Sequence, residues 1–219
     1  MESASPPRET GAISDDAELQ VAWTAAVGSG PDATGALADV LARHREAHRR
    51  YHGVRHVTWV VRHVRELAAE VPLDDDAAVV VAAFFHDAVY DPHAADNEEQ
   101  SARLAERVLA ELGWDEARRR RVGDLVRATA AHEAPPDDDT AVLLDADLAV
   151  LGSDPAAYQA YVTGVRAEYA HVDAAGWRVG RGQVLRDLLA RDPLYATAPA
   201  RRRWARRAAA NMTAELATL

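Results

Sequence analysis

The 219-residue sequence contains no cysteine and no lysine. The absence of cysteine excludes disulfide frameworks, thiolate nucleophiles, iron–sulfur clusters and thiolate zinc sites, so nitrogen and oxygen atoms must hold any bound metal. All 25 positive charges are arginines, and 35 aspartates and glutamates outnumber them to give a formal net charge of -10. A negative chain repels polyanions, which disfavours nucleic acid as a partner.

The sequence also lacks a long apolar run. The longest such run, residues 77–85, is too short to span a bilayer, and residues 1–16 show neither the basic start nor the apolar centre of a signal peptide. We therefore expect a cytoplasmic protein that makes no use of a membrane. Hydrophobic residues form 48% of the chain and charged residues 27%, which is typical of a folded globular protein.

The distribution of apolar residues predicts helices. Residues 1–14 are rich in polar residues and proline without any apolar period, so we expect a disordered tail, followed by one domain over residues 15–219. Apolar residues then recur at three- and four-residue spacings, as in Leu104, Val108 and Leu112, and glycine or proline separates segments of helical length. The sequence predicts an all-α, single-domain helical bundle of roughly eight to ten helices.

The most apolar of these segments ends in a polar pair. Residues 77–85 follow three aspartates and are hydrophobic on nearly every side, which indicates a helix at the centre of the bundle despite the valines. His86 and Asp87 come directly after it. Burying this pair without a partner is costly, although a buried histidine bonded to its neighbour is the commoner explanation of such a dipeptide.

Two other segments carry similar side chains. His52 and His56 are four residues apart and share a face if a helix has begun by His52. Asp145 and Asp147 lie in an otherwise apolar stretch. One histidine and one aspartate from these two segments, together with the His-Asp pair, give two histidines and two carboxylates, a set that matches an octahedral metal site with positions open for water.

The order of His56, then His86 and Asp87, then Asp147 resembles the H…HD…D signature of the HD-domain metal-dependent phosphohydrolases. Further motifs over residues 50–215 resemble a compact bacterial family of predicted HD phosphohydrolases. These motifs are Tyr-His-x-x-x-His, Phe-His-Asp-x-x-Tyr-Asp, Asp-Asn-Glu-x-x-Ser-Ala, Ala-Thr-x-x-His, Asp-Ala-Asp-Leu and Arg-x-Glu-Tyr. The resemblance implies an HD-type bundle in which these four residues bind a divalent ion, with Mn, Fe, Co, Ni or Mg more natural than zinc.

The Tyr-His-x-x-x-His motif also resembles the catalytic domain of cyclic nucleotide phosphodiesterases, which are distant HD relatives. That likeness implies His52 as the proton donor to the leaving oxygen and His56 as a metal ligand. Gly53 departs from the asparagine usual there and no nucleotide-clamping glutamine is evident, so cyclic nucleotide specificity is not carried over. The Asp-Leu element favours Asp147 over Asp145 as fourth ligand, with Asp145 placed to orient a histidine.

Several other residues are candidates around this centre. Glu98 is either directed toward the metal or a first-turn acid favoured by the helix dipole. His132 is a candidate for a second metal or for the substrate phosphate, or else a surface or capping residue. Arginine suits bidentate contact with phosphate oxygens. The phosphate-binding candidates are Arg50, Arg55 and Arg181.

The sequence thus predicts a metal-dependent phosphohydrolase that cleaves a small phosphate monoester or diester, for example a nucleotide. The ion would lower the pKa of a bound water and polarise the phosphoryl group. Asp87 would take the proton of the nucleophile, and His52 would protonate the departing alkoxide.

Two alternatives remain open. The first is an HD-fold oxygenase with two irons, for which Glu98 and His132 are the evident extra ligands. The second is a non-catalytic HD module that senses a nucleotide or phosphorylated metabolite.

Overall fold

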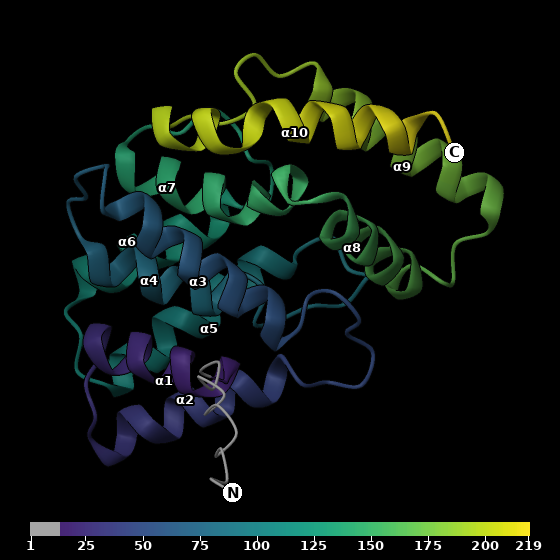
Figure 1. The fold of residues 1–219 in the computed structure, drawn as a ribbon. Helices are drawn as coiled ribbons and strands as arrows, with labels where there is room; N and C mark the ends of the chain where they lie inside the picture. Colours follow the sequence, from purple (N-terminus) through teal and green to yellow (C-terminus); the bar gives the residue numbers. More distant parts are fainter. Residues whose placement is uncertain (1–13) are drawn as a thin grey trace, which may run out of the picture.

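The computed structural model describes residues 14–219, and within them the chain forms ten α-helices, one 3-10 helix and no strand (Figure 1). This confirms the predicted all-α, single-domain class. The elements are α1 Asp15–Ala26, α2 Pro31–Arg43, α3 Val54–Ala68, α4 Asp76–Phe85, α5 Asn97–Glu111, α6 Glu116–Ala128, α7 Asp138–Asp147, η1 Leu148–Gly152, α8 Pro155–Glu168, α9 Ala174–Leu189 and α10 Ala198–Leu216.

The predicted tail falls outside the described residues except for Ser14, whose hydroxyl accepts a hydrogen bond from the amide of Ala17 and caps α1. Among the helices described, none is both long enough and apolar enough to cross a membrane.

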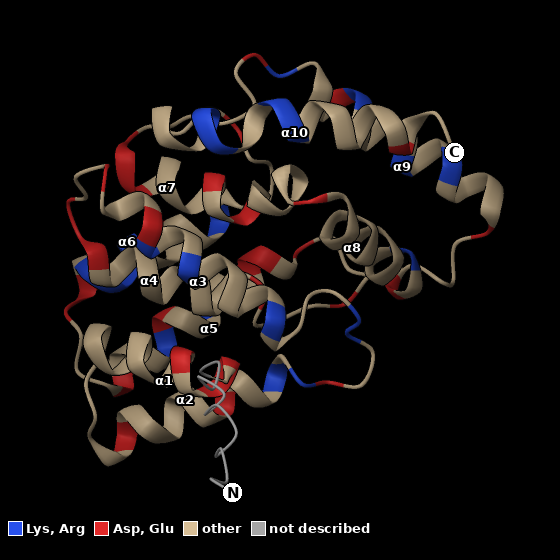
Figure 2. Ribbon diagram, in the orientation of Figure 1, with Lys and Arg blue, Asp and Glu red and all other residues tan. Residues whose placement is uncertain are grey.

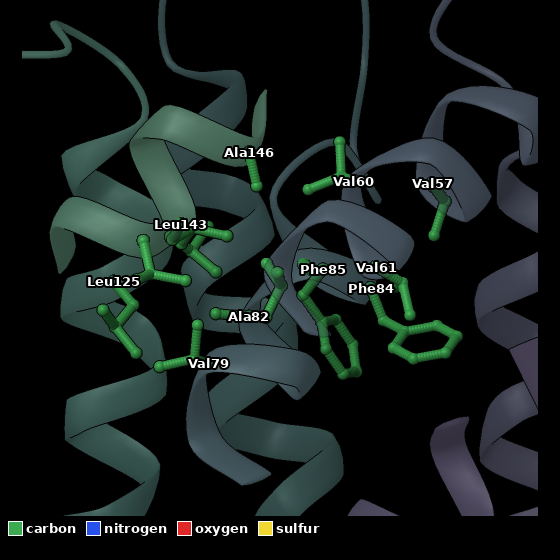
Figure 3. Close-up of a cluster of buried hydrophobic side chains, with 14 of the residues drawn as sticks. Val57, Val60, Val61, Val79, Ala82, Phe84, Phe85, Leu125, Leu143 and Ala146 are labelled. Carbon is green, nitrogen blue, oxygen red and sulfur yellow. The ribbon is translucent and has the colours of Figure 1, made fainter. Parts of the chain in front are cut away.

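Helix α4 lies at the centre of the bundle, as its sequence predicts. It packs against α1, α3, α5, α6 and α7. Val79 and Phe85 on α4 have no exposed surface, and they meet Val61 of α3, Leu125 of α6 and Leu143 of α7 in one apolar cluster (Figure 3). Each such side chain contributes about 1.5–3 kcal/mol by leaving water. The centre of the fold is therefore set by a helix without a polar face.

Local signals fix both ends of α4. Asp75 is its N-cap, where the carboxylate accepts a hydrogen bond from the amide of Ala78 at 3.0 Å. Arg118 of α6 holds the same carboxylate through two hydrogen bonds of 2.6 and 2.8 Å. The helix ends at His86, so the His-Asp pair emerges from the hydrophobic core at a defined point.

The C-terminal helices form a second layer over the core (Figure 1). Helix α10 packs along η1, and the approach at Gly152 is so close that a Cβ there would lie 2.8 Å from the Cα of Trp204. This contact fixes the segment that follows the ligand candidate on α7. Basic residues mark the beginning of α3 and the loop before it, on the side that faces α8 (Figure 2).

Candidate metal centre

The carboxyl end of α4 presents His86 toward a buried cluster. The Nδ1–H group of His86 donates to the carbonyl of Ala83 at 2.9 Å, one of the carbonyls that a helix end leaves free. This bond fixes the tautomer, so that Nε2 carries the lone pair. His86 is 2% exposed, and the neighbouring Asp87 side chain is 14% exposed. The end of α4 therefore offers one nitrogen ligand and one oxygen ligand at the edge of the core.

Three helices converge on this point. The Nε2 atoms of His56 and His86 lie 2.9 Å apart, and Oδ1 of Asp147 lies 3.3 and 3.6 Å from them. These three ligand atoms all lie within 4.8 Å of one another, so the group could hold a metal ion. Oδ2 of Asp87 is 3.3 Å from His56 and 3.1 Å from His86. The structure thus brings together all four residues that the sequence suggested as ligands.

The carboxylates and imidazoles of the cluster favour a positive charge between them. Burial alone would lower the pKa of His56, but Asp147 and Asp87 outweigh it and raise that pKa to about 9. Burial raises the pKa of Asp147, and hydrogen bonds from His132 and His56 reverse this effect and lower it. Two imidazole lone pairs that face each other between carboxylates need a proton or a cation between them. This donor set of nitrogen and oxygen atoms fits a divalent ion.

His52 lies beside the cluster but not on the helix. The condition under which His52 and His56 would share a helix face is not met, because Gly53 is the N-cap and α3 begins at Val54. The two imidazole rings are nevertheless 5.6 Å apart. The side chain of His52 is 21% exposed, and its Nδ1 lies 2.6 Å from Oε2 of Glu168. The turn before α3, rather than helical periodicity, places this imidazole.

Glu168, at the end of α8, is a site residue that spacing did not reveal. Oε1 accepts hydrogen bonds from the backbone amides of residues 50, 51 and 52 at 2.7, 2.7 and 3.0 Å. Oε2 accepts from His52 and from the hydroxyl of Tyr90 at 3.0 Å. Burial raises the pKa of Glu168, but the hydrogen bonds from His52 and the backbone lower it to about 2. Glu168 is the glutamate of the Arg-x-Glu-Tyr motif, but no spacing in the sequence connects this motif with His52.

Arg49 is a second residue that sequence reasoning missed. Its buried guanidinium donates to the carbonyls of His52 at 2.9 Å, Asp87 at 2.7 Å and Ala88 at 3.2 Å. These bonds tie the turn before α3 to the segment after α4. His44 adds a bond of 3.0 Å from Nε2 to the carbonyl of Phe84, and burial lowers the pKa of His44 to about 3. The position of His52 relative to Asp87 therefore depends on this arginine.

The two aspartates of α7 have different roles. Asp147 faces the cluster, whereas the carboxylate of Asp145 accepts hydrogen bonds from the amides of Ala196 at 2.8 Å and Thr197 at 2.7 Å. Burial raises the pKa of Asp145. Asp145 thus fixes the segment before α10 instead of orienting a histidine, which corrects the sequence-based expectation.

His132 lies against the centre. Its Nε2 is 2.8 Å from Oδ2 of Asp147, whereas the other oxygen of that carboxylate, Oδ1, lies 3.3 Å from Nε2 of His56. Its backbone has the uncommon left-handed conformation, with φ at 48°. Arg191 donates to the carbonyls of Ala131 and His132 and holds this turn in place. The structure therefore places His132 where it could orient Asp147 or join a second ion.

Two other candidates are not in the group of converging ligand atoms. Glu98 is in the first turn of α5, half-buried, and its charge, after burial and Glu168, contributes to the raised pKa of Tyr169. Arg181 is 8% exposed, bonds both oxygens of Glu215 at 2.8 and 3.0 Å, and donates to the hydroxyl of Tyr161. The guanidinium of Arg181 is therefore already bound to Glu215 and Tyr161 inside the fold, which corrects its assignment as a phosphate ligand.

The remaining arginine candidates lie at a pocket beside His56. This pocket has a volume of about 190 Å³ and lies between the beginning of α3, η1 and α8. Arg50 and Arg55 line it together with Tyr51. Both arginines are exposed at its edge. The structure thus puts two of the three predicted phosphate-binding residues next to the cluster.

Comparisons with known proteins add nothing to this geometry. No protein-family model, no curated protein and no solved structure matches the chain. Membership of the HD superfamily therefore stays a prediction from the motifs.

Proposed function

We propose that this protein is a metal-dependent phosphohydrolase that cleaves a small phosphate monoester or diester. The convergence of the ligand atoms of His56, His86, Asp87 and Asp147, with His52 held beside them by a buried glutamate, is the observation that supports this proposal. The same residues carry the resemblance to HD phosphohydrolases, which supports an HD-type bundle. Arginines at the adjacent pocket suit a substrate with phosphate oxygens.

The four converging residues would hold the metal. When bound, a divalent ion would make water a stronger nucleophile and polarise the phosphoryl group. Mn, Fe, Co, Ni and Mg all accept nitrogen and oxygen ligands in an octahedral arrangement. The bond from His86 to the carbonyl of Ala83 leaves Nε2 as the nitrogen that would bind an ion. Asp87, whose side chain is 14% exposed, would accept the proton that water loses.

His52 would protonate the leaving oxygen. Because Nδ1–H is bonded to the ionised Glu168, Nε2 remains free to carry a proton toward the substrate. The carboxylate of Glu168 fixes the orientation of the imidazole and the nitrogen that faces the site, as a carboxylate does in other histidine pairs. The hydroxyl of Tyr90 bonds to the same carboxylate and limits its movement. In this proposal His52 donates the proton, and His56 and His86 bind the metal.

Metal content and phosphate release test the proposal together. We expect purified protein to retain a divalent ion and to release phosphate from esters when Mn, Fe, Co, Ni or Mg is supplied. His86→Ala should lose both properties, because it removes a ligand atom. His52→Ala should keep the metal but lose about 100-fold or more in rate, as expected for a general acid.

His171→Ala is the matched control, since this histidine is exposed and its ring stacks near those of His93 and Tyr169, neither of which is a candidate ligand. It should match the unmodified protein in metal content and in rate. Retained metal together with full activity in His86→Ala would contradict the assignment of the ligands.

The contact of His132 with Asp147 favours one alternative. Asp147 could bridge two ions if His132 binds the second, which an oxygenase with two irons requires. Glu98, the other extra ligand expected for that chemistry, contributes to the raised pKa of Tyr169 and is not in the group of His56, His86 and Asp147. Two irons per chain and oxygen uptake without phosphate release would replace the hydrolase by this alternative.

A further inference from the structure

The pocket beside the metal centre has aromatic walls. Tyr51 and Trp59 line it from the side of α3, and Tyr161 lines it from α8. The rings of Tyr51 and Tyr161 are 4.8 Å apart in an edge-to-face arrangement. Small residues of η1 and α8 complete the lining. Tyr51 and Tyr161 therefore form one continuous aromatic surface, which a flat apolar group in the pocket would contact.

Two residues of the pocket also carry buried donors without an acceptor. Nδ1 of His56 and Nε1 of Trp59 are both buried and form no hydrogen bond within residues 14–219. The indole nitrogen can only donate, and Nδ1 of His56 donates whenever Nε2 faces a metal. Buried donors without a partner are rare in folded proteins, and these two lie on residues that line one side of the pocket.

The charge at the pocket is positive. Arg50 and Arg55 are exposed at its edge, and in the part of the chain that the structure describes neither guanidinium pairs with a carboxylate. Arg49, directly before them, is by contrast held by three backbone carbonyls. In a protein with a net charge of -10, two unpaired arginines at one pocket favour an oxyanion.

The volume limits what can bind. An apolar cavity of about 150 Å³ is known to accept benzene. A pocket of about 190 Å³ is therefore suited to one six-membered ring and little more. Of the four candidate ligands, His56 alone lines the pocket, so a bound ring would lie next to the metal centre and not on it.

We propose that this pocket binds the non-reacting half of the phosphoester substrate, and that this half is a single aromatic ring with a second anionic group. The ring contacts Tyr51, Trp59 and Tyr161, and the anionic group faces Arg50 and Arg55. The inference rests on the proposed phosphohydrolase activity, and it names the class of substrate for that site.

Three esters with leaving alcohols of similar acidity test the inference. With Mn-loaded protein, kcat/KM for benzyl phosphate should exceed that for methyl phosphate by about tenfold or more, because one ring leaves water. A carboxylate on the ring, in 4-carboxybenzyl phosphate, should add about tenfold through charged hydrogen bonds. Arg55→Gln and Arg50→Gln should each reduce this second gain. Arg107→Gln, an exposed arginine of α5 that does not line the pocket, should leave it unchanged.

A blocking variant and a binding measurement do not depend on the arginines. Ala160 lines the pocket but is exposed, so Ala160→Phe should fill the space without disturbing the core and should reduce the preference for benzyl over methyl phosphate to about threefold or less. The non-hydrolysed 4-carboxybenzylphosphonate should change the tryptophan fluorescence of the protein on binding. Trp59→Phe should remove most of that change, because Trp59 lies in the pocket.

The outcomes separate the two proposals. If no ester is hydrolysed with any metal, the proposed function fails, and the phosphonate titration still decides whether the pocket binds an aromatic anion. If esters are hydrolysed at equal efficiency and Ala160→Phe behaves like the unmodified protein, the function stands and the pocket assignment is overturned. Absence of phosphonate binding overturns the assignment as well.

Discussion

Replacement of Glu168 by alanine is the sharpest test of the arrangement around His52. The carboxylate side chain has no exposed surface and accepts five hydrogen bonds, three of them from the backbone of residues 50–52. Glu168→Ala leaves these donors without an acceptor. Removing one partner of a buried charged interaction leaves the other partner uncompensated and costs about 3–5 kcal/mol. We expect the free energy of unfolding to fall by about this amount.

The pKa of Glu168 gives an independent magnitude. A pKa of about 2, against the usual value near 4.5, corresponds to about 3 kcal/mol of preference for the ionised form in the folded state. Because the pKa is lowered on folding, this stabilisation is present above pH 4.5 and is lost as the pH falls from about 4.5 toward about 2. The two estimates agree, so a loss of about 10 °C in melting temperature is expected for a chain of this length.

Urea unfolding followed by circular dichroism measures this effect. Glu168→Gln should be less stable than the unmodified protein at pH 7, and the difference should shrink between pH 4.5 and pH 3, since glutamine does not titrate. Glu111→Ala, at the exposed end of α5, should change stability by no more than about 0.5 kcal/mol. A Glu168→Ala protein within about 1 kcal/mol of the unmodified one would refute the reasoning, because unpaired buried donors cost more than that.

Three further predictions follow from other parts of the molecule. A divalent cation at 100 times its dissociation constant should stabilise the protein by about 2.7 kcal/mol in thermal melts, and His86→Ala should abolish the gain. Arg181→Met should lower the free energy of unfolding, measured by urea titration, by about 3 kcal/mol, because it leaves Glu215 buried without its partner. If the substitution changed only the KM for substrate, Arg181 would again be a candidate phosphate ligand. Gly152→Ala should destabilise the protein by about 1–3 kcal/mol, because the added Cβ would meet the backbone of α10. Gly180→Ala should stabilise it by about 0.4–1 kcal/mol, because the space around that Cα is open. Equal calorimetric melting temperatures of the two variants would contradict this contrast.

Local patterns in the sequence were sufficient for the helical class and for the position of α4. Hydrophobic periodicity and capping residues are read within a few positions of the chain, and both were informative here. The candidate ligands His56, His86, Asp87 and Asp147 were also accessible, because a polar group in an apolar segment is conspicuous without any structure. The sequence by itself thus determined the fold class and the residues most expected to bind a metal.

Only the tertiary structure decided how those residues are supported. Glu168 lies 116 positions from His52 and Arg49 lies 38 positions from Asp87, and no local spacing predicts either contact. The choice of Asp147 over Asp145 likewise depends on which way each side chain points after α7 meets its neighbours. Hydrogen bonds between distant segments form only when packing brings those segments together. For that reason the sequence indicates the chemistry of this site, while the packing of the helices determines its geometry.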